Sequence, residues 1–392
     1  MTKSPLPPAG GTLDHFVNEA PFDPHSIEKL TKEQETVYLA SQWKLMWWKF
    51  CRHRVAVVCG VFLLVLYLMI LVAEFLSPYN YQSRQIDYIY ASPQAVHFFH
   101  DGKFEGPFVY GLKYRLNMEN LRREYTPDRT QIQHLRFFCR GQSYKFWGVF
   151  DSDWHLMCPA KGGQAFLLGT DKLGRDMLSR IIHGARISLT IGLAGVAVSI
   201  ILGVVLGGLA GYFGGMTDLM VQRLIEVLQS LPSIPLWLVI SALVPITWSA
   251  LAVYLFITII LGLIEWTGLA RSVRSKLLSL REEDYVLAAQ LMGAKSSRII
   301  GRHLIPGFTS HLIASATLAI PSMILGETAL SFLGLGLREP ITSWGVLLTQ
   351  AQNINVVALY PWLMLPVVPV ILVVLAFNFL GDGLRDAADP YK

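Results

Sequence analysis

Long blocks of apolar residues, separated by short polar segments, run along this chain. In the first block, residues 55–76, Glu74 is the only charged residue. A helix needs roughly 20 apolar residues to cross about 30 Å of hydrocarbon, so this block predicts a membrane-spanning helix. It follows 54 mostly polar residues, which indicates a retained span rather than a cleaved signal peptide.

Further apolar blocks follow after a long polar segment. Residues 187–217 contain no Asp, Glu, Lys or Arg, and residues 225–270 are charged only at Glu226 and Glu265. One helix over 225–270 would run about 70 Å at 1.5 Å per residue, about twice the thickness of a bilayer. We therefore predict two spans joined by a turn near residues 245–249. Two more spans, over residues 312–330 and 362–380, bring the prediction to six.

Gly203, Gly207 and Gly211 lie four residues apart in the second predicted span. They share one face of a helix, where small residues let a neighbouring helix approach closely within lipid. The same residues also fit the high glycine content of membrane helices in general. The sequence leaves both explanations open.

The composition requires that these blocks face something other than water. Of the 392 residues, 53% are hydrophobic and 16% are charged, whereas soluble domains average about 25% charged residues. With a mean hydropathy of +0.42, the chain is not an ordinary soluble enzyme, a disordered protein or a disulfide-dense scaffold. The net charge of +5 does not indicate a nucleic-acid partner, because the basic residues flank apolar blocks.

The distribution of Lys and Arg predicts the orientation in the membrane. Basic residues gather in residues 44–54, before the first span, and in residues 271–306, between the fourth and fifth spans. The turn near 245–249 has none, and residues 331–360 contain only Arg338. By the positive-inside rule, both termini and the 271–306 segment are expected in the cytoplasm. The chain is thus expected to cross the membrane several times and to contact lipid.

The segment between the first two spans is expected on the other side. Residues 77–186 carry fifteen Lys and Arg residues, but loops of this length cross largely regardless of charge. Residues 77–165 are too long for a connector and too aromatic for disorder, so we predict a small extracytoplasmic subdomain, mainly β or mixed. Cys139 and Cys158 lie within it and are expected either to form a disulfide or to remain as two buried thiols.

The sequence assigns no catalytic residue, metal ligand or bound cofactor. Its four cysteines include no C-x-x-C pair, and its ten histidines lack the spacing of an H-E-x-x-H site. An intramembrane hydrolase is disfavoured because a nucleophile elbow and paired membrane aspartates are absent. A G-x-x-x-x-G-K-[ST] phosphate loop is also absent, so ATP-driven transport would need an ATPase on another chain.

A short amphipathic helix is predicted within the 271–306 segment. Four of its residues recur at i, i+3, i+4 and i+7 and would form one apolar stripe: Tyr285, Ala288, Ala289 and Met292. Asp284 suits the N-terminal end of this helix, and Gly293 suits its C′ position. So short a helix is unstable alone, so its stripe is expected to contact a partner.

This segment resembles the EAA loop of ABC importer permeases. The similarity rests on Ala288-Ala289, on Gly293 after three further residues, and on His303-Leu304-Ile305-Pro306 after nine more. In that family the loop is the coupling helix that docks on the ATPase subunit. This chain has Leu287 in place of the name-giving Glu and Gly307 where relatives often have Asn, so a salt bridge through that Glu does not apply.

Further motifs narrow the resemblance to dipeptide and oligopeptide permeases of the DppC/OppC type. Together with residues 43–79, the matching segments are residues 169–176, 179–180, 184–189, 330–336, 343–345, 378–386 and 389–390. They cover nearly everything except residues 1–40 and the insertion, which is longer than in the simplest members of the family.

The resemblance implies an all-α type I importer permease fold of six transmembrane helices, with the β or mixed insertion between helices 1 and 2. The expected division is a cytoplasmic N-terminal segment (1–54), the first transmembrane helix (55–76), a periplasmic insertion (77–165), a permease core (166–381) with the coupling loop 271–306, and a cytoplasmic C-terminal tail (382–392).

The resemblance also implies a function and partners. The chain would be a permease subunit of a binding-protein-dependent importer in the bacterial inner membrane. It would pair with a homologous second permease, with two ATPase subunits that hold ATP and Mg²⁺, and with an extracytoplasmic binding protein. Di- or oligopeptides are the expected substrates, and oligosaccharides or another small solute are the alternative.

A second group of candidate residues precedes the second span. It is interpreted as a periplasmic gate or docking motif and comprises Gly169, Thr170, Asp171, Gly174, Arg175 and Asp176. Thr170 or Asp171 is expected to cap the helix that enters the membrane, and Arg175 to pair with a neighbouring acid or loop carbonyl. An acid/base site is disfavoured, although the carboxylate spacing would allow one.

Three acids lie in or near the spans, where an ionisable group is by default a functional-site hypothesis. We expect Glu226 to pair with Arg223 and Glu265 to lie beside Arg271. Glu327 has no cation within a helical turn and is left as a candidate for the translocation path. A proton-coupled transporter using Glu327 or Glu226 is the alternative class of function.

Prolines are the remaining candidates for the translocation path. Pro232, Pro235, Pro366 and Pro369 are expected to interrupt their helices and to free carbonyl groups. Bends along a translocation path and simple packing kinks both remain open.

Overall fold

The computed structural model of the chain describes residues 39–118, 122–160, 162–245 and 247–388. The chain divides into two units, residues 1–45 and residues 46–392. Helix α2 (Gln42–Arg52) begins in the first unit. Most of the predicted segment 1–54, and the end of the predicted tail with its Asp389-Pro390 match, lie outside the described residues.

Helices form most of the second unit. Among the described residues, five stretches are long and apolar enough to cross a membrane. They are α3 (Arg54–Leu71), α5 (Met177–Phe213), α8 (Ala250–Leu280), α12 (Thr309–Phe332), and α15 (Val367–Ala388) together with the 3₁₀ turn η4 (Pro361–Met364). They correspond to the first, second, fourth, fifth and sixth predicted spans.

The third predicted span is not a straight helix. The chain forms α6 (Gly215–Ser230) and α7 (Ser233–Ala242), which are bent by 84° relative to each other. Leu231 between them is extended, with ψ of 134°. Proline disfavours the helical conformation of the residue before it, here Leu231, and Pro232 itself has no N–H to donate. The described residues therefore contain five spans, or six if this bent pair is one span.

Helices α5 and α8 form the most extensive helix pair, and glycines allow their close approach. A Cβ atom at Gly211 would lie 2.8 Å from the carbonyl oxygen of Arg274, and one at Gly203 would lie 3.0 Å from the Leu269 side chain. Gly207, between them, faces the backbone of α8. The glycine face therefore serves helix packing, which decides between the two explanations that the sequence left open.

Helix α12 contacts both α5 and α15, and α15 contacts α3. The core between these helices includes Leu189 of α5, Met323 of α12 and Trp344 of the short helix α13 (Trp344–Leu348). The Trp344 side chain is fully buried, and its indole N–H donates to the carbonyl of Ile181 at 3.1 Å. This contact fixes the chain after α12 against the start of α5.

Strands build the insertion between α4 (Ala73–Leu76) and α5, after a single 3₁₀ turn, η1 (Ile86–Tyr88), in the described residues. One antiparallel sheet contains β1 (His97–His100), β2 (Lys103–Asn117) and β3 (Arg122–His134), and a second contains β4 (Arg136–Phe146) and β5 (Phe150–Cys158). β-branched residues are few, but aromatic residues favour strands equally well. Ring contacts such as Phe99 with Phe104 join neighbouring strands.

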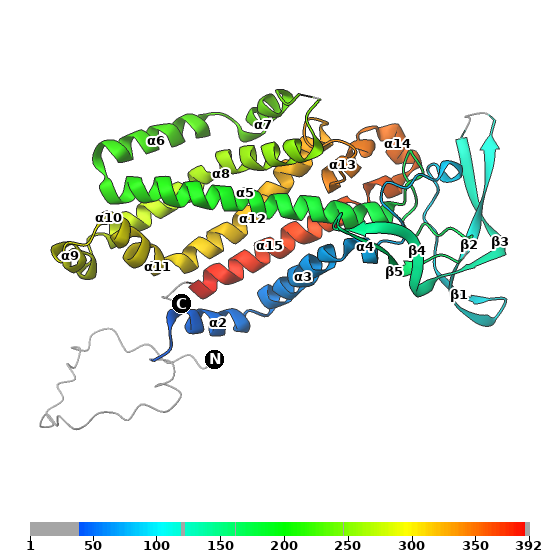
Figure 1. Ribbon diagram of the computed structural model, residues 1–392, viewed down its shortest axis with the longest axis horizontal. Coiled ribbons are helices and arrows are strands. Elements are labelled where there is room, and N and C mark those ends of the chain that lie inside the picture. Colours follow the sequence, from blue (N-terminus) through cyan, green and yellow to red (C-terminus); the bar gives the residue numbers. More distant parts are fainter. Residues whose placement is uncertain (1–38, 119–121, 161, 246, 389–392) are drawn as a thin grey trace, which may run out of the picture. The chain divides into compact units, whose positions relative to one another are not determined.

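Short elements occupy the two ends of the helical bundle. One end holds α9 (Asp284–Leu291), α10 (Ser296–Arg298), the π-helical turn η2 (Ile299–Leu304) and α11 (Ile305–Gly307). The other holds α13, η3 (Thr349–Gln352), α14 (Ile354–Leu359) and the strands of the insertion. Figure 1 shows both groups, and we call these the α9 end and the insertion end. The predicted coupling loop 271–306 begins inside α8, which continues to Leu280.

Pro232 lies at the break between α6 and α7 and so interrupts the third predicted span, as expected, whereas the other three candidate prolines lie at or just before helix starts. Pro232 is the N-cap residue of α7, and Pro235 lies in its first turn. Pro366 directly precedes α15, and Pro369 lies in its first turn. At these positions the missing N–H removes no intrahelical hydrogen bond. Pro321, by contrast, lies inside α12, and no sequence pattern had singled it out.

Candidate functional site

Helix α9 stands at one end of the bundle with well-defined ends. It runs from Asp284 to Leu291, and Gly293 follows with φ of 80°, a left-handed conformation that suits glycine. The Gly293 N–H donates to the Gln290 carbonyl at 2.9 Å, and the next N–H donates to the Ala289 carbonyl at 3.1 Å. This pair of bonds is the Schellman motif that ends helices. Asp284 and Gly293 therefore occupy the helix positions predicted for them.

The two faces of α9 differ in burial. Val286 and Ala289 are buried in a core cluster with Leu277 of α8 and Leu312 of α12. The other surface exposes large apolar side chains: Tyr285 (44% exposed), Leu287 (45%), Leu291 (90%) and Met292 (81%). We call these four residues the coupling patch. An exposed apolar patch of this kind is a surface for a partner.

The predicted apolar stripe is therefore only partly an exposed surface. Its other members are exposed, but Ala289 is 3% exposed and packs inward. Leu287 and Leu291, which lie outside the stripe, belong to the exposed surface. Spacing could not find them, because α9 is apolar on both faces and only tertiary contacts show which face the protein itself covers.

Charged side chains of both signs flank the coupling patch along the chain. Glu282, Glu283 and Asp284 are exposed just before Tyr285, and Lys295, Arg298 and Arg302 are exposed in the segment that follows α9. Pro306 lies in α11, where it is exposed. A partner at this end would need an apolar groove with complementary charges on both sides, because complementary charge guides docking.

Buried charges meet at the start of α5, at the insertion end. Asp171 and Arg180 are 0% exposed. Arg175 Nε donates to Asp171 Oδ2 at 2.7 Å, and Arg180 pairs with the same carboxylate. Glu339 Oε1 lies 2.6 Å from Arg175 Nη2 and 3.2 Å from Arg180 Nη2. We call Asp171, Arg175, Arg180 and Glu339 the charge cluster; it ties residues 169–176 to the loop after α12.

The electrostatics of the charge cluster favour ionised carboxylates. Burial alone would raise the pKa of Asp171, but Arg180 and Arg175 outweigh it and hold this pKa below its usual value. The pKa of Glu339 is also lowered, because Arg175 and Arg180 outweigh its partial burial. These paired carboxylates have no proton to donate at neutral pH. The structure therefore favours a structural role over acid/base chemistry.

Asp176, not Thr170 or Asp171, caps α5, which corrects the predicted cap. The Asp176 carboxylate accepts hydrogen bonds from Ser179 N at 2.8 Å and Ser179 Oγ at 2.6 Å. Burial raises the pKa of Asp176 to about 6. The Thr170 hydroxyl instead accepts a hydrogen bond from Ala91 N at 2.8 Å, which joins the motif to the insertion. The Asp171 carboxylate accepts hydrogen bonds from the backbone N–H groups of Leu173 and Arg175, before α5 begins at Met177.

The glycines of this motif allow close backbone packing. Gly169 and Gly174 have φ of 75° and 71°, which other residues adopt only with strain. A Cβ atom at Gly169 would lie 2.7 Å from the Ala91 carbonyl oxygen, and one at Gly174 would clash with the backbone of Gln85. The motif is therefore a tightly packed joint between the insertion and α5.

Glu327 of α12 is fully buried and is held by serine hydroxyl groups. Its carboxylate accepts hydrogen bonds from Ser343 at 2.6 Å, Ser331 at 2.8 Å and Ser188 at 3.0 Å. These hydroxyls in turn accept hydrogen bonds from backbone N–H groups of residues 337–346. The carboxylate thus joins α5, α12 and the loop after α12, and no described residue forms a salt bridge with it.

The two other acids in the spans differ in exposure. Glu226 Oε2 lies 2.7 Å from Arg223 Nη1, so the predicted ion pair forms, and both side chains are exposed. Glu265 is half-buried. In the described part of the chain, no group of three or more His, Cys, Asp or Glu residues is placed to hold a metal ion.

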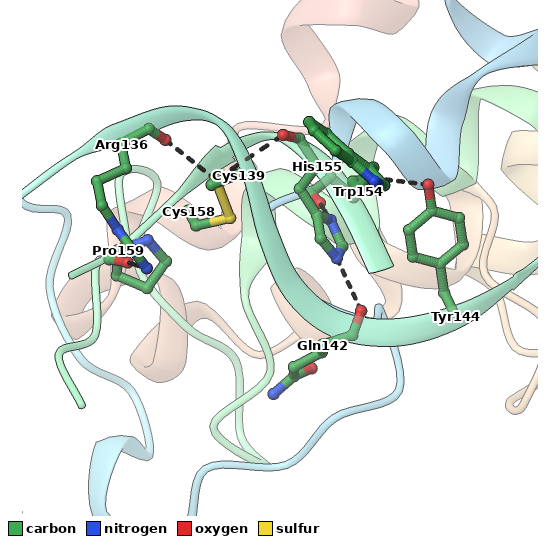
Figure 2. The surroundings of a disulfide bond; sticks show 9 residues. Arg136, Cys139, Gln142, Tyr144, Trp154, His155, Cys158 and Pro159 are labelled. Atoms are coloured by element: carbon green, nitrogen blue, oxygen red, sulfur yellow. Dashed lines mark hydrogen bonds between the residues drawn. A yellow bond between two sulfur atoms is a disulfide. The ribbon is translucent and has the colours of Figure 1, made fainter. Parts of the chain in front are cut away.

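A disulfide joins Cys139 to Cys158, with their Cα atoms 6.2 Å apart (Figure 2). It links β4 to β5. Beside it, the His155 ring lies 2.8 Å from the Gln142 carbonyl oxygen and 2.6 Å from the Ser77 carbonyl oxygen. The β4–β5 hairpin is therefore cross-linked internally and fixed to the chain that leaves α4.

A cavity of about 730 Å³ lies next to this hairpin. The hairpin, residues 79–82, the start of α5 and residues 340–342 line it. In its wall, the two terminal nitrogens of Arg186 bind the two oxygens of Glu74, each at 2.7 Å. Its lining combines hydroxyl, amide and charged groups with aromatic and aliphatic side chains, and the apolar surface is the larger part.

Known proteins resemble this chain over most of its helical part. Residues 203–391 match the family described as "Binding-protein-dependent transport system inner membrane component". Residues 41–93 match the family described as "N-terminal TM domain of oligopeptide transport permease C". A chain of the MetNI methionine ABC transporter, solved in inward-facing conformations, aligns at 18% identity over 53% of this chain and 97% of its own, with a TM-score of 0.40, too low to assign a fold.

Curated relatives are more similar. The oligopeptide transport system permease protein OppC of Haemophilus influenzae is 40% identical over 242 residues, which are 61% of this chain and 75% of that protein. OppC of Escherichia coli K12 is 41% identical over 61% of this chain and 78% of that protein. The dipeptide transport system permease protein DppC of Bacillus subtilis is 40% identical over 57% of this chain and 68% of that protein. This chain is therefore a multi-pass membrane protein that belongs to the DppC/OppC family of ABC transporter permeases.

Proposed function

We propose that this chain is a permease subunit of a binding-protein-dependent ABC importer that passes di- or oligopeptides across the bacterial inner membrane. Its relatives are named as oligopeptide, dipeptide and di/tripeptide transport permeases, which supports peptides over oligosaccharides. The chain is a transport subunit rather than an enzyme. Separate subunits hydrolyse ATP with Mg²⁺, since this sequence has no phosphate loop.

The coupling patch is the observation that carries this proposal. Leu291 and Met292 are 90% and 81% exposed at the end of α9, where the Schellman motif at Gly293 closes the helix. The inner face of the same helix packs on Leu277 of α8 and Leu312 of α12. Movement of an ATPase subunit bound to the patch would therefore pass directly into two membrane helices.

The proposed orientation rests on two independent features. Basic residues at the α9 end favour the cytoplasm for that end. The Cys139–Cys158 disulfide at the other end favours an oxidising compartment such as the periplasm. Both features support an insertion outside the cytoplasm, a coupling patch inside it and cytoplasmic termini.

The proposed assembly contains a homologous second permease as heterodimer partner, two ATPase subunits and an extracytoplasmic binding protein. Closure of the ATPase subunits would move α9 and switch the spans between inward and outward openings. The charge cluster and the Glu327 serines would keep the insertion-end loops as one rigid gate during this movement. Peptide would enter from the binding protein at the insertion end.

The test is ATPase activity of the whole complex reconstituted in lipid. Leu291→Asp places a charge in the coupling patch and should abolish the stimulation of ATPase activity by loaded binding protein. Gly293→Pro should do the same, because proline cannot adopt φ of 80°. Ser297→Asp, an exposed position in α10, is the matched control and should remain stimulated. Normal coupling in Leu291→Asp would refute the docking role.

The substrate class needs a separate measurement. Thermal shift of the cognate binding protein with dipeptides, longer peptides and oligosaccharides should give stabilisation by peptides. Stabilisation by an oligosaccharide alone would leave the coupling mechanism intact but overturn the peptide assignment.

A further inference from the structure

The turn of the β4–β5 hairpin lies against the end of the first span. The Trp147 indole N–H donates to the carbonyl of Leu71, the last residue of α3, at 2.9 Å. The Arg186 guanidinium covers the Trp147 ring at 4.4 Å from its centroid. Because α3 crosses the hydrocarbon and ends at Leu71, Trp147 lies at the depth where hydrocarbon meets lipid headgroups.

Apolar side chains around this turn are exposed. Val149 and Phe150 are 71% and 70% exposed, and Phe138 is 66% exposed. The Phe138 ring centroid lies 6.2 Å from that of Phe75, in α4. Consecutive Cα atoms are about 3.8 Å apart, so Val149 lies within about 7.6 Å of Trp147. The headgroup layers add about 5–8 Å on each side of the hydrocarbon, so the turn reaches no further than this layer.

The exposed surface continues onto the first span. Leu64, Leu68 and Leu71 of α3 recur at i, i+4 and i+7 and are 60%, 55% and 48% exposed. The hairpin turn and this stripe are joined by the bond from Trp147 to Leu71. An apolar patch in water would be unfavourable, whereas aromatic residues concentrate where membrane and water meet.

We propose that the turn of the β4–β5 hairpin is a membrane anchor: Phe138, Trp147, Val149 and Phe150 insert into the lipid headgroup layer beside α3. The partner is the lipid surface. The anchor holds the hairpin wall of the 730 Å³ cavity at a fixed height above the bilayer. The proposal does not depend on the transported substrate or on the ATPase contact.

The test measures the depth of single labels in the complete complex in lipid nanodiscs. The free cysteines Cys51 and Cys59 are first replaced by Ser and Ala. Val149→Cys then carries an environment-sensitive fluorophore, and Arg129→Cys, exposed in β3 of the other sheet, is the matched control. Lipids with nitroxide headgroups should quench Val149 several-fold more than Arg129, and aqueous iodide should quench in the opposite order. Phe150→Cys repeats the measurement if Val149→Cys does not assemble.

Equal quenching of the two labelled sites by both quenchers would overturn the anchor. Protection of Val149 from iodide without quenching by nitroxide lipid would also overturn it, because a protein partner would then cover the turn. ATPase activity of each labelled complex, measured in parallel, separates this result from a failure of the proposed function.

Discussion

At the α9 end, Leu291 and Met292 are 90% and 81% exposed, whereas at the insertion end Asp171 and Arg180 are 0% exposed. Apolar side chains are thus left in solvent at one end, and charged side chains are buried at the other. Both arrangements are costly in an isolated chain: the first exposes an apolar patch, and the second removes charges from water.

The difference shows two ways in which a permease uses side chains in unfavourable surroundings: apolar ones exposed to solvent and charged ones buried. The coupling patch is exposed in this chain and can be buried by a partner, so its residues should matter for coupling and little for folding. The buried charges already have their partners within the chain. Removing one of them should therefore damage the fold itself. Substitutions at the two ends should separate stability from activity.

Arg180→Met is expected to have the largest effect on stability. It removes a guanidinium that faces Asp171 and Glu339 and leaves buried carboxylate charge undercompensated, which costs about 3–5 kcal/mol. Thermal unfolding of the purified complex in detergent measures the loss. Arg223→Met is the control, because its exposed pair with Glu226 contributes less than about 1 kcal/mol. Equal shifts in the two variants would contradict the role of the charge cluster.

Glu327→Ala should have the next largest effect. It removes the acceptor of the Ser188, Ser331 and Ser343 hydroxyls, and leaving buried polar groups unpaired costs about 1–3 kcal/mol. Glu327→Gln keeps an oxygen for two of these hydroxyls and should lose less. The same unfolding assay compares them; an equal loss with Gln and with Ala would show that the carboxylate charge, and not the hydrogen bonds, holds this site.

Asp176→Asn should give a smaller, pH-dependent change. Burial raises the pKa of Asp176 from 3.8 to about 6, so the folded state binds this proton more tightly than the unfolded chain. The stability that follows is present below pH 3.8 and is lost as the pH rises through about 6. Asn caps a helix equally well without titrating, so the variant should have the higher Tm at neutral pH. The difference should disappear on acidification; a constant difference would refute this.

Leu291→Asp should change stability least, by no more than about 0.5 kcal/mol, as surface substitutions usually do. The same variant should lose stimulated ATPase activity, for the reasons given with the proposed function. Unfolding and ATPase assays on one preparation test both statements. A large loss of stability would mean that Leu291 belongs to the core of the chain and not to a partner surface.

Several features followed from local sequence because their physics is local. The spans at 55–76, 187–217 and 312–330 are recognisable from apolar length alone. Gly293 ends α9 because it adopts φ of 80°. The break in the third span, at Leu231 and Pro232, is also encoded locally, and the expectation that Pro232 interrupts its helix is confirmed.

Other features needed the fold. The stripe on α9 was predicted from spacing, yet Ala289 packs inward, because α8 and α12 cover that face. The cap of α5 was placed too early, because a turn from Asp171 to the left-handed Gly174 intervenes and the helix begins only after Asp176. Glu339 lay outside every motif, and the serines around Glu327 lay within segments that resemble the family, but nothing in those segments linked them to Glu327.

By itself, the sequence determined that the chain spans a membrane repeatedly, carries a strand-forming insertion and ends a short helix at Gly293. These depend on length, composition and single-residue conformation. Only the tertiary structure decided which groups meet: Ser188 with Glu327, 139 residues apart, and Arg175 with Glu339, 164 residues apart. Such contacts are set by how helices and loops pack, and a pattern read along one segment holds no information about a partner on another.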